Sequence, residues 1–236
     1  MIALIDADVL VYRVGYASED CEEPWMVKAR LEESIDQILY SLGNPNYRLF
    51  LSDSKSNFRN ALFPLYKANR TQPKPKYYEH ITNWLLNIWH AEVAWNEEAD
   101  DALGIEQVRE GQNSIIVSID KDLLQIPGNH YNFVNHNRSF VEPFEGVFNF
   151  YKQVLTGDSS DNVCIKTGLS CPTIGAAKAQ KCLEGCPDEA ALFNTVRNLY
   201  RKFCGIPDVE ADQRLLLTGQ LLKIRQKEGE IWEFPV

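Results

Sequence analysis

Short apolar runs alternate along the first part of the chain with longer segments whose apolar residues recur every three to four positions. The short runs lie at residues 2–5, 47–51, 91–95, 114–119 and 130–134. Their length and their branched and aromatic side chains predict strands, whereas the spacing within residues 27–42 and 77–90 predicts helices. Strands that alternate with helices predict an α/β fold with a mostly parallel central sheet.

After about residue 147 the pattern changes to helices and loops. We therefore expect two regions, an α/β domain at residues 1–147 and a helical region at residues 148–236. The α/β domain would include a basic stretch within residues 54–90, between the second and third predicted strands.

Four of the predicted strands end in acidic residues. They lead to Asp6, to Asp53, to the run Glu98-Ala99-Asp100-Asp101, and to Asp120 with Asp122. The carboxyl ends of parallel strands meet at one edge of a sheet, so we expect these acids to line a single pocket. Alternation along an extended segment would put Asp8 on the same side as Asp6.

Several carboxylates in one pocket repel one another unless a cation lies among them. Oxygen ligands without clustered histidines or thiolates favour Mg²⁺ or Mn²⁺ over zinc. The acids outnumber what one ion needs, and two ions about 4 Å apart are the usual arrangement for phosphodiester hydrolysis. Residues 157–162 add Asp158 and Asp161, which are three positions apart and able to share a helix face. The pattern therefore predicts a site for two Mg²⁺ ions, in which Mn²⁺ could substitute.

The charge along the chain is uneven. The net charge is −9, yet residues 54–78 contain no acid and carry six basic residues. These are Lys55, Arg59, Lys67, Arg70, Lys74 and Lys76. Such a patch attracts phosphate even on an acidic protein, and basic groups near the metal ions offset transition-state charge. A helix would show Lys67 and Arg70 on one face, and Tyr66 is the aromatic residue that we expect to touch a base.

The composition is that of a globular protein. No apolar run approaches the roughly 20 residues that cross a bilayer, and no basic n-region or cleavage site marks a signal peptide. We expect a cytoplasmic protein, in the host cytoplasm if a phage encodes it. Six cysteines in such a chain are expected to be reduced, and their loose spacing does not predict a zinc site.

Five blocks, in order over nearly the whole chain, carry a resemblance to a known family. The blocks are Ala3–Asp6; Phe50–Asp53 followed by Phe58-Arg59 and Tyr66–Arg70; Glu98–Asp101; Ile119–Gln125; and Gly157–Asn162. They resemble the 5′-nuclease family: flap endonucleases, the 5′-exonuclease domain of bacterial DNA polymerase I, and stand-alone phage 5′-exonucleases. The resemblance implies a PIN-like α/β domain followed by a helix–three-turn–helix element, which grips duplex DNA through backbone amides and a bound K⁺ ion.

The resemblance also implies roles for individual residues. The first metal ion would be bound mainly by Asp6, Asp53, Glu98, Asp100 and Asp101, and the second by Asp120, Asp122, Asp158 and Asp161. Lys67 and Arg70 would contact the scissile phosphate, and Asp100 would be essential for catalysis. Further DNA contacts would come from Arg59, Tyr66, Lys74, Lys76, Gly175, Lys178 and Lys181, with the last two on the duplex-binding helix.

Three features depart from the family pattern. Asp8 stands where the family usually has a small or hydroxyl residue, and it either caps the next segment or adds an outer-shell acid. Residues 163–175 form a longer segment in place of a glycine-rich hairpin, with Thr173 where a glycine is expected. Glycines there allow the backbone to approach phosphate closely, so this change bears on duplex binding and on the K⁺ site. The stretch between Arg70 and Tyr77 is short and rich in proline.

Taken together, these features predict a Mg²⁺-dependent 5′-to-3′ exonuclease and structure-specific flap endonuclease. Its substrate would be DNA with a free 5′ end or a flap, and the family implies RNA in an RNA–DNA hybrid as a second substrate. We expect a monomer that does not bind membranes.

Two alternatives use parts of the same pattern. A haloacid-dehalogenase-like phosphatase would use Asp6-Ala7-Asp8-Val9 as its nucleophile motif and Asp158 with Asp161 as its last acidic motif. That interpretation leaves the Glu98–Asp101 run and the basic patch without a role. The substitution Asp8→Ala would separate the two enzymes, because only the phosphatase needs that acid. A nucleic-acid-binding scaffold with a degenerate site is disfavoured because every expected acid is present.

Overall fold

The computed structural model describes residues 1–170 and 174–235. The chain forms two compact units, Met1–Asn57 with Gln72–Val141 and Phe58–Thr71 with Glu142–Val236. This division differs from the predicted one, because the first unit ends at Val141 instead of residue 147 and residues 58–71 belong to the second unit. The physical reason is that helix α6 (Pro143–Thr156) packs on the later helices, as does helix α3 (Phe58–Leu62). Within the described ranges, no helix is long and apolar enough to cross a bilayer.

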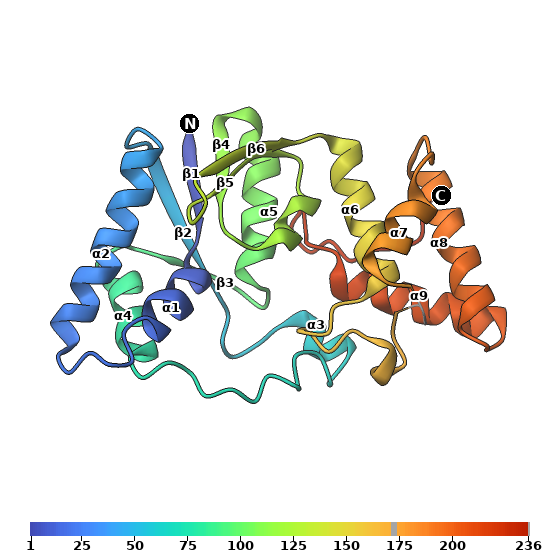
Figure 1. The fold of residues 1–236 in the computed structure, drawn as a ribbon, viewed down its shortest axis with the longest axis horizontal. Coiled ribbons are helices and arrows are strands. Elements are labelled where there is room, and N and C mark those ends of the chain that lie inside the picture. Colours follow the sequence, from blue (N-terminus) through green and yellow to red (C-terminus); the bar gives the residue numbers. More distant parts are fainter. Residues whose placement is uncertain (171–173, 236) are drawn as a thin grey trace. The chain divides into compact units, whose positions relative to one another are not determined.

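The first unit is built on a six-stranded sheet in the order β3-β2-β1-β4-β5-β6 (Figure 1). The strands are β1 Ile2–Asp6, β2 Asn46–Ser52, β3 Glu92–Ala94, β4 Ser114–Val117, β5 Gly128–Asn132 and β6 Asn137–Val141. Strands β1 to β5 are parallel, and β6 is antiparallel to β5. The predicted α/β fold with a mostly parallel sheet is confirmed. The sequence pattern does not predict β6, because most of its residues are exposed and polar.

Helices cover both faces of this sheet. They are α1 Ala7–Tyr16, α2 Pro24–Ser41, α4 Tyr78–Asn87 and α5 Ala99–Glu110, with 3₁₀ turns η1 Gly111–Asn113 and η2 Lys121–Gln125. Ala3 and Ile5 belong to a core shared with α1, α2 and α4. Leu4 alternates to the opposite face, where α5 packs across β1 to β4 (Figure 1). Because both faces of β1 are covered, its residues are apolar until Asp6.

The second unit is mainly helical. It contains α3, α6, η3 Ile165–Thr167, α7 Ala176–Leu183, α8 Glu189–Phe203 and α9 Asp208–Leu222. Its main core joins the apolar faces of α6 to α9 with Trp232 of the C-terminal segment. The Trp232 ring centroid lies 5.4 Å from that of Phe150 and 5.6 Å from that of Phe234. The same indole lies against Gly219, where a β-carbon would collide with it.

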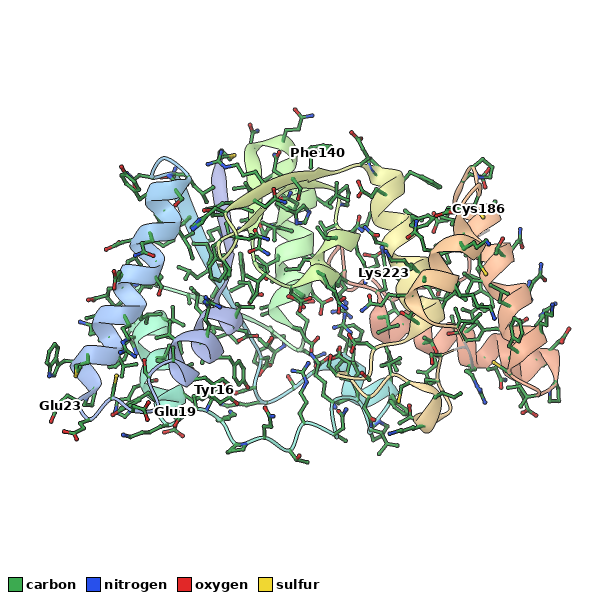
Figure 2. The ribbon with its side chains drawn as sticks, viewed as in Figure 1. Tyr16, Glu19, Glu23, Phe140, Cys186 and Lys223 are labelled. Atoms are coloured by element: carbon green, nitrogen blue, oxygen red, sulfur yellow. The ribbon has the colours of Figure 1, made fainter. Side chains whose placement is uncertain are left out.

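The proline-rich stretch that leads into α4 is tied to the end of α1. The Tyr16 hydroxyl donates to the Pro73 carbonyl (3.0 Å), and the Glu19 carboxylate accepts the Lys76 N–H (3.1 Å). Tyr16 and Glu19 are labelled in Figure 2. The Lys76 ammonium donates to the Cys21 carbonyl at 2.9 Å. This stretch therefore packs as part of the first unit.

Candidate active site

The carboxyl edge of the sheet contains a switch point, because β2 and β4 flank β1 on opposite sides. Open parallel sheets bind ligands at such a point. Asp6 ends β1 there and is 2% exposed. Its carboxylate accepts the Val9 N–H (3.1 Å), which caps α1, and the Ser118 hydroxyl (2.7 Å) just beyond β4. Two donors from different elements therefore fix the position of this carboxylate.

The Asp6 carboxyl resists ionisation. Burial is the main cause that raises its pKa from 3.8 to about 7, and the negative charge of Asp8 and, to a lesser extent, of Asp120 raises it further. The hydrogen bonds from Ser118 and Val9 act in the opposite direction. A cation beside Asp6 would favour the charged form, so the chemistry of this position suits a metal ligand.

The expectation that Asp8 follows Asp6 along an extended strand, on the same side, is wrong. The strand ends at Asp6 and α1 begins at Ala7, so Asp8 lies in the first helical turn. Its carboxylate accepts the Ser52 N–H at 3.2 Å, at the end of β2. Asp8 thus links two strand ends and adds negative charge near Asp6.

The Glu98–Asp101 run forms the start of α5 through reciprocal capping. The Asp101 carboxylate accepts the Glu98 N–H at 3.1 Å, and the Glu98 side chain in turn accepts the Asp101 N–H. Glu98 also accepts the Asn57 amide at 2.9 Å, and the Ala99 N–H donates to the Ser52 hydroxyl at 2.9 Å. Asp101 is fully buried, whereas Asp100 is half-buried in the same turn. The Asp101 carboxylate therefore has a structural role in starting the helix.

Asp53, after β2, is held ionised. The Ser56 hydroxyl, followed by the N–H groups of Lys55 and Asn96, lowers its pKa to about 2. The hydrogen-bond distances are 2.7, 2.8 and 3.1 Å respectively. The Asp53 N–H donates to the Glu97 carbonyl at 3.2 Å, which connects this carboxylate to the turn before α5.

Asp120 and Asp122 follow β4 at the start of η2. The Asp120 N–H donates to the Ser118 hydroxyl (3.0 Å), and the Asp120 carboxylate accepts the Asp122 N–H (2.8 Å). Ser118 therefore connects Asp6 with Asp120. The acid pattern does not point to Ser118, Ser52 or Asn57, and the signal that could have found the two serines is their position one or two residues before Asp53 and Asp120.

The Asp158–Asp161 segment in the second unit is a turn, so the expectation of a shared helix face is wrong. Helix α6 ends at Thr156, and Gly157 has a φ of +68°, which favours glycine. Backbone hydrogen bonds between Asp158 and Val163 close the turn at 2.7 and 2.8 Å. The Asp158 carboxylate accepts the Ser160 N–H at 2.7 Å and the Ser160 hydroxyl at 2.6 Å.

Asp161 collects three side chains from the basic stretch. Its carboxylate lies 2.7 Å from the Arg70 guanidinium and 3.7 Å from the Lys67 ammonium, and it accepts the Tyr66 hydroxyl at 2.8 Å. Lys67 has a φ of +56°, so Lys67 and Arg70 do not share a helix face as expected. Tyr66 is 3% exposed in a cluster with Leu221. So little exposed surface argues against the predicted contact between Tyr66 and a base.

The remaining residues of the predicted DNA surface differ in accessibility. Arg59 is 2% exposed, so it cannot make the surface contact expected of it. The Lys74 ammonium lies 3.8 Å from the centroid of the Tyr78 ring. Lys178 and Lys181 are exposed on α7, whose first turn follows Gly175. Thr173 lies outside the described residues.

The arrangement of the acidic side chains decides whether they form a group that could hold a metal ion. Across residues 1–170 and 174–235, no three histidine, cysteine, aspartate or glutamate side chains stand in a group that could hold a metal ion. The carboxylates accept hydrogen bonds from backbone N–H groups and from serine and asparagine side chains. The donor chemistry nevertheless suits a divalent ion, because the negative charges of Asp8 and Asp120 act on the buried Asp6 carboxylate, and hard cations prefer carboxylate oxygens.

Comparison with known proteins identifies the family. Residues 1–152 match the family model described as the 5′-3′ exonuclease, N-terminal resolvase-like domain. The chain belongs to the 5′-3′ exonuclease family. A protein named 5′-3′ exonuclease from Buchnera aphidicola subsp. Schizaphis graminum is 28% identical over 232 residues, which covers 84% of this chain and 72% of that protein.

Two solved nuclease structures from bacteriophage T5 share the fold of this chain. The T5 5′-exonuclease with bound zinc matches with a TM-score of 0.71 and 14% identity, over 94% of this chain and 88% of that chain. The T5 D15 flap endonuclease in a complex with DNA and metal ions matches with a TM-score of 0.69 and 14% identity, over 92% and 88%. The chain is therefore a nuclease with a PIN-like fold, and the phosphatase interpretation is set aside.

Proposed function

We propose that this nuclease is a Mg²⁺-dependent 5′-to-3′ exonuclease and structure-specific flap endonuclease that acts on DNA. The observation that carries the proposal is the buried Asp6 at the switch-point edge, whose ionisation Asp8 and Asp120 oppose, with Asp53 following β2 and Glu98 starting α5 in the same unit. The T5 D15 flap endonuclease, whose structure holds DNA and metal ions, supports the same substrate and metal class.

The proposed ligands of the first ion are Asp6, Asp53, Glu98, Asp100 and Asp101, and those of the second are Asp120, Asp122, Asp158 and Asp161. Bound Mg²⁺, for which Mn²⁺ can substitute, supplies Lewis acidity that lowers the pKa of the attacking water and stabilises charge on the leaving 3′ oxygen. Asp101 contributes mainly by starting α5, because its carboxylate caps that helix. The Ser118 hydroxyl orients the Asp6 carboxylate, and the Ser52 N–H orients the Asp8 carboxylate.

Lys67 and Arg70 are the proposed contacts to the scissile phosphate. Both carry their positive charge beside Asp161. Two oxygens of a phosphate group offer Arg70 the same bidentate acceptor geometry as the two oxygens of a carboxylate. Tyr66 holds Asp161 by its hydroxyl and takes no part in base stacking.

Duplex binding is proposed for the helical part of the chain. Lys178 and Lys181 on α7 would approach backbone phosphates, Gly175 would allow close approach at the helix start, and a K⁺ ion would bind within residues 163–175. Lys74 and Lys76 would add charge on the approach to the site, although the Lys76 ammonium already donates to the Cys21 carbonyl. We further propose a monomeric cytoplasmic enzyme that also accepts RNA in an RNA–DNA hybrid.

The test is cleavage of a 5′-labelled flap duplex, with a phosphomonoester as the competing substrate. Wild-type protein should release short 5′ products with Mg²⁺ and none with EDTA, and Asp100→Asn should lose the activity. Asp8→Ala should retain most of it. Phosphomonoester hydrolysis that Asp8→Ala abolishes would instead identify a phosphatase. DNA binding that needs Lys67, with no cleavage by any variant, would identify a degenerate scaffold.

A further inference from the structure

Arg59 lies in the basic stretch but is buried at a helix end. Its guanidinium donates to the carbonyl of Leu221 through Nε and to the carbonyl of Lys223 through Nη2, each at 2.8 Å. These carbonyls lie at the C-terminus of α9, where the last carbonyls of a helix lack intrahelical donors. A positive group is also favoured there by the helix dipole.

The residues next to Arg59 extend the same attachment. The Arg225 guanidinium lies 3.6 Å from the centroid of the Phe58 ring, and Arg225 donates through Nε to the Glu230 carbonyl at 2.8 Å. Arg59 lies 4.5 Å from that ring centroid. Phe58 and Arg59 thus fasten α3 to the chain that follows α9.

A short path of contacts leads from Arg59 to the proposed phosphate-binding side chains. The Phe63 N–H donates to the Arg59 carbonyl at 2.8 Å, and the Tyr66 N–H donates to the Phe63 carbonyl at 2.9 Å. The Lys67 N–H then donates to the Asp161 carbonyl at 2.9 Å, and the Arg70 N–H to the Lys67 carbonyl at 3.1 Å.

The backbone at the end of this path is in a conformation that needs support. Lys67 has a φ of +56°, a left-handed conformation that a non-glycine residue holds only where its surroundings impose it. The surroundings here are the Asp161 turn and the fixed start of the segment at Arg59.

We infer that Arg59 is a positioning residue, which holds α3 on the C-terminus of α9 so that Lys67 and Arg70 are presented beside Asp161. It acts through those two cations and does not touch DNA. The inference rests on the proposed phosphate-binding role of Lys67 and Arg70. It replaces the surface contact that the sequence suggested for Arg59.

A double-mutant cycle tests this role. Arg59→Met keeps the aliphatic volume and removes the donors, and it should lower kcat/KM on the flap duplex by about 10- to 100-fold, as expected when catalytic groups shift by about 1 Å. In the Lys67→Ala/Arg70→Ala background, the same change should lower kcat/KM by less than about twofold, because the groups that it positions are gone. Lys227→Ala, an exposed cation of the same unit, serves as a control that leaves activity unchanged.

Arg59→Lys separates positioning from a direct phosphate contact. Lysine keeps the positive charge but lacks the forked guanidinium that reaches two carbonyls, so the cleavage activity of Arg59→Lys should stay as low as that of Arg59→Met. The salt dependence of DNA binding should change no more in Arg59→Lys than in Arg59→Met. Rescue by lysine, with a salt slope that falls by about one unit in Arg59→Met alone, would establish a phosphate contact and overturn the inference.

Unfolding of a variant and failure of the proposed function are distinguished by separate measurements. All assays run at a temperature where circular dichroism and urea titration show each variant folded, and Arg59→Lys replaces Arg59→Met if the latter is unfolded. An equal loss in both backgrounds would overturn the inference. Wild-type activity of Lys67→Ala/Arg70→Ala would overturn the inference and the role of the two cations, while Mg²⁺-dependent cleavage itself would stand.

Discussion

Replacing Asp6 by asparagine should stabilise the metal-free protein and abolish cleavage. Asp6 is 2% exposed, and burial together with Asp8 and Asp120 raises its pKa to about 7. Asparagine has the same shape: its Oδ1 can accept the Val9 N–H, and its NH2 group can donate to the Ser118 hydroxyl oxygen instead of accepting from it. It carries no charge, so it escapes the repulsion that a buried carboxylate meets.

The size of this effect follows from the pKa difference. A folded pKa of about 7, against 3.8 for the ordinary carboxyl, opposes folding by up to about 4 kcal/mol above pH 7. The folded pKa is raised, so this unfavourable contribution grows between pH 4 and pH 7 and is complete above pH 7. Because the amide must also be accommodated, we expect a gain of about 1–3 kcal/mol for Asp6→Asn in EDTA at pH 8.

The assay is urea unfolding in EDTA at pH 8, repeated with Mg²⁺. Asp6→Asn should be more stable than wild type in EDTA, and Mg²⁺ should stabilise wild type more than the variant. Cleavage should fall at least about 100-fold. Asp36→Asn, at an exposed position on α2, is the matched control and should leave stability and activity unchanged. A variant less stable than wild type in EDTA would refute the reasoning, because Asp6 would then contribute more as an anion than its repulsion costs.

Three further substitutions test other parts of the structure. Tyr66→Phe removes the hydroxyl that holds Asp161 and should lower the single-turnover cleavage rate about 10-fold with little change in stability. The control Tyr40→Phe, at an exposed position, should have no effect. An unchanged rate in Tyr66→Phe would argue against the positioning of Asp161. Gly219→Ala should destabilise the second unit by about 1–3 kcal/mol in urea, because its methyl group collides with Trp232, and unaltered unfolding would contradict that packing. Asp212→Asn should cost about 2 kcal/mol at pH 7, because Arg201 and Arg197 hydrogen-bond the carboxylate and hold its pKa below the usual range. Since that pKa is lowered, the wild-type advantage should begin to shrink as pH falls below about 4 and should be lost only as pH approaches the lowered pKa of the folded state. A difference that stays equal between pH 7 and about pH 2 would refute the ion pair.

The strands of the parallel sheet could be predicted because their residues are buried on both faces and form uninterrupted apolar runs. The same rule fails for β6, an edge strand whose side chains are mostly exposed. It also fails at Asp8, because the change from strand to helix occurs within one residue of Asp6 and leaves no hydrophobic signal.

The placement of the acids at strand ends could be predicted because each apolar run leads directly to them. The side chains that hold the acids could not, since Ser118, Ser52 and Asn57 are single polar residues without a periodic pattern. The basic stretch shows the limit most clearly. By charge alone, Arg59 cannot be told apart from the exposed basic residues near it. Its burial depends on the Leu221 carbonyl, an acceptor 162 residues away in the chain.

Metal dependence of the acids at the carboxyl edge of the sheet can be measured by single-turnover cleavage of a 5′-labelled flap duplex as a function of Mg²⁺ concentration, with wild type and Asp100→Asn compared. We expect no product in EDTA, a wild-type rate that rises cooperatively with Mg²⁺ as two ions bind, and release of short 5′ fragments that is lost in Asp100→Asn. Cleavage that persists in EDTA or in Asp100→Asn would contradict a metal-dependent site built on the acids at the carboxyl edge of the sheet.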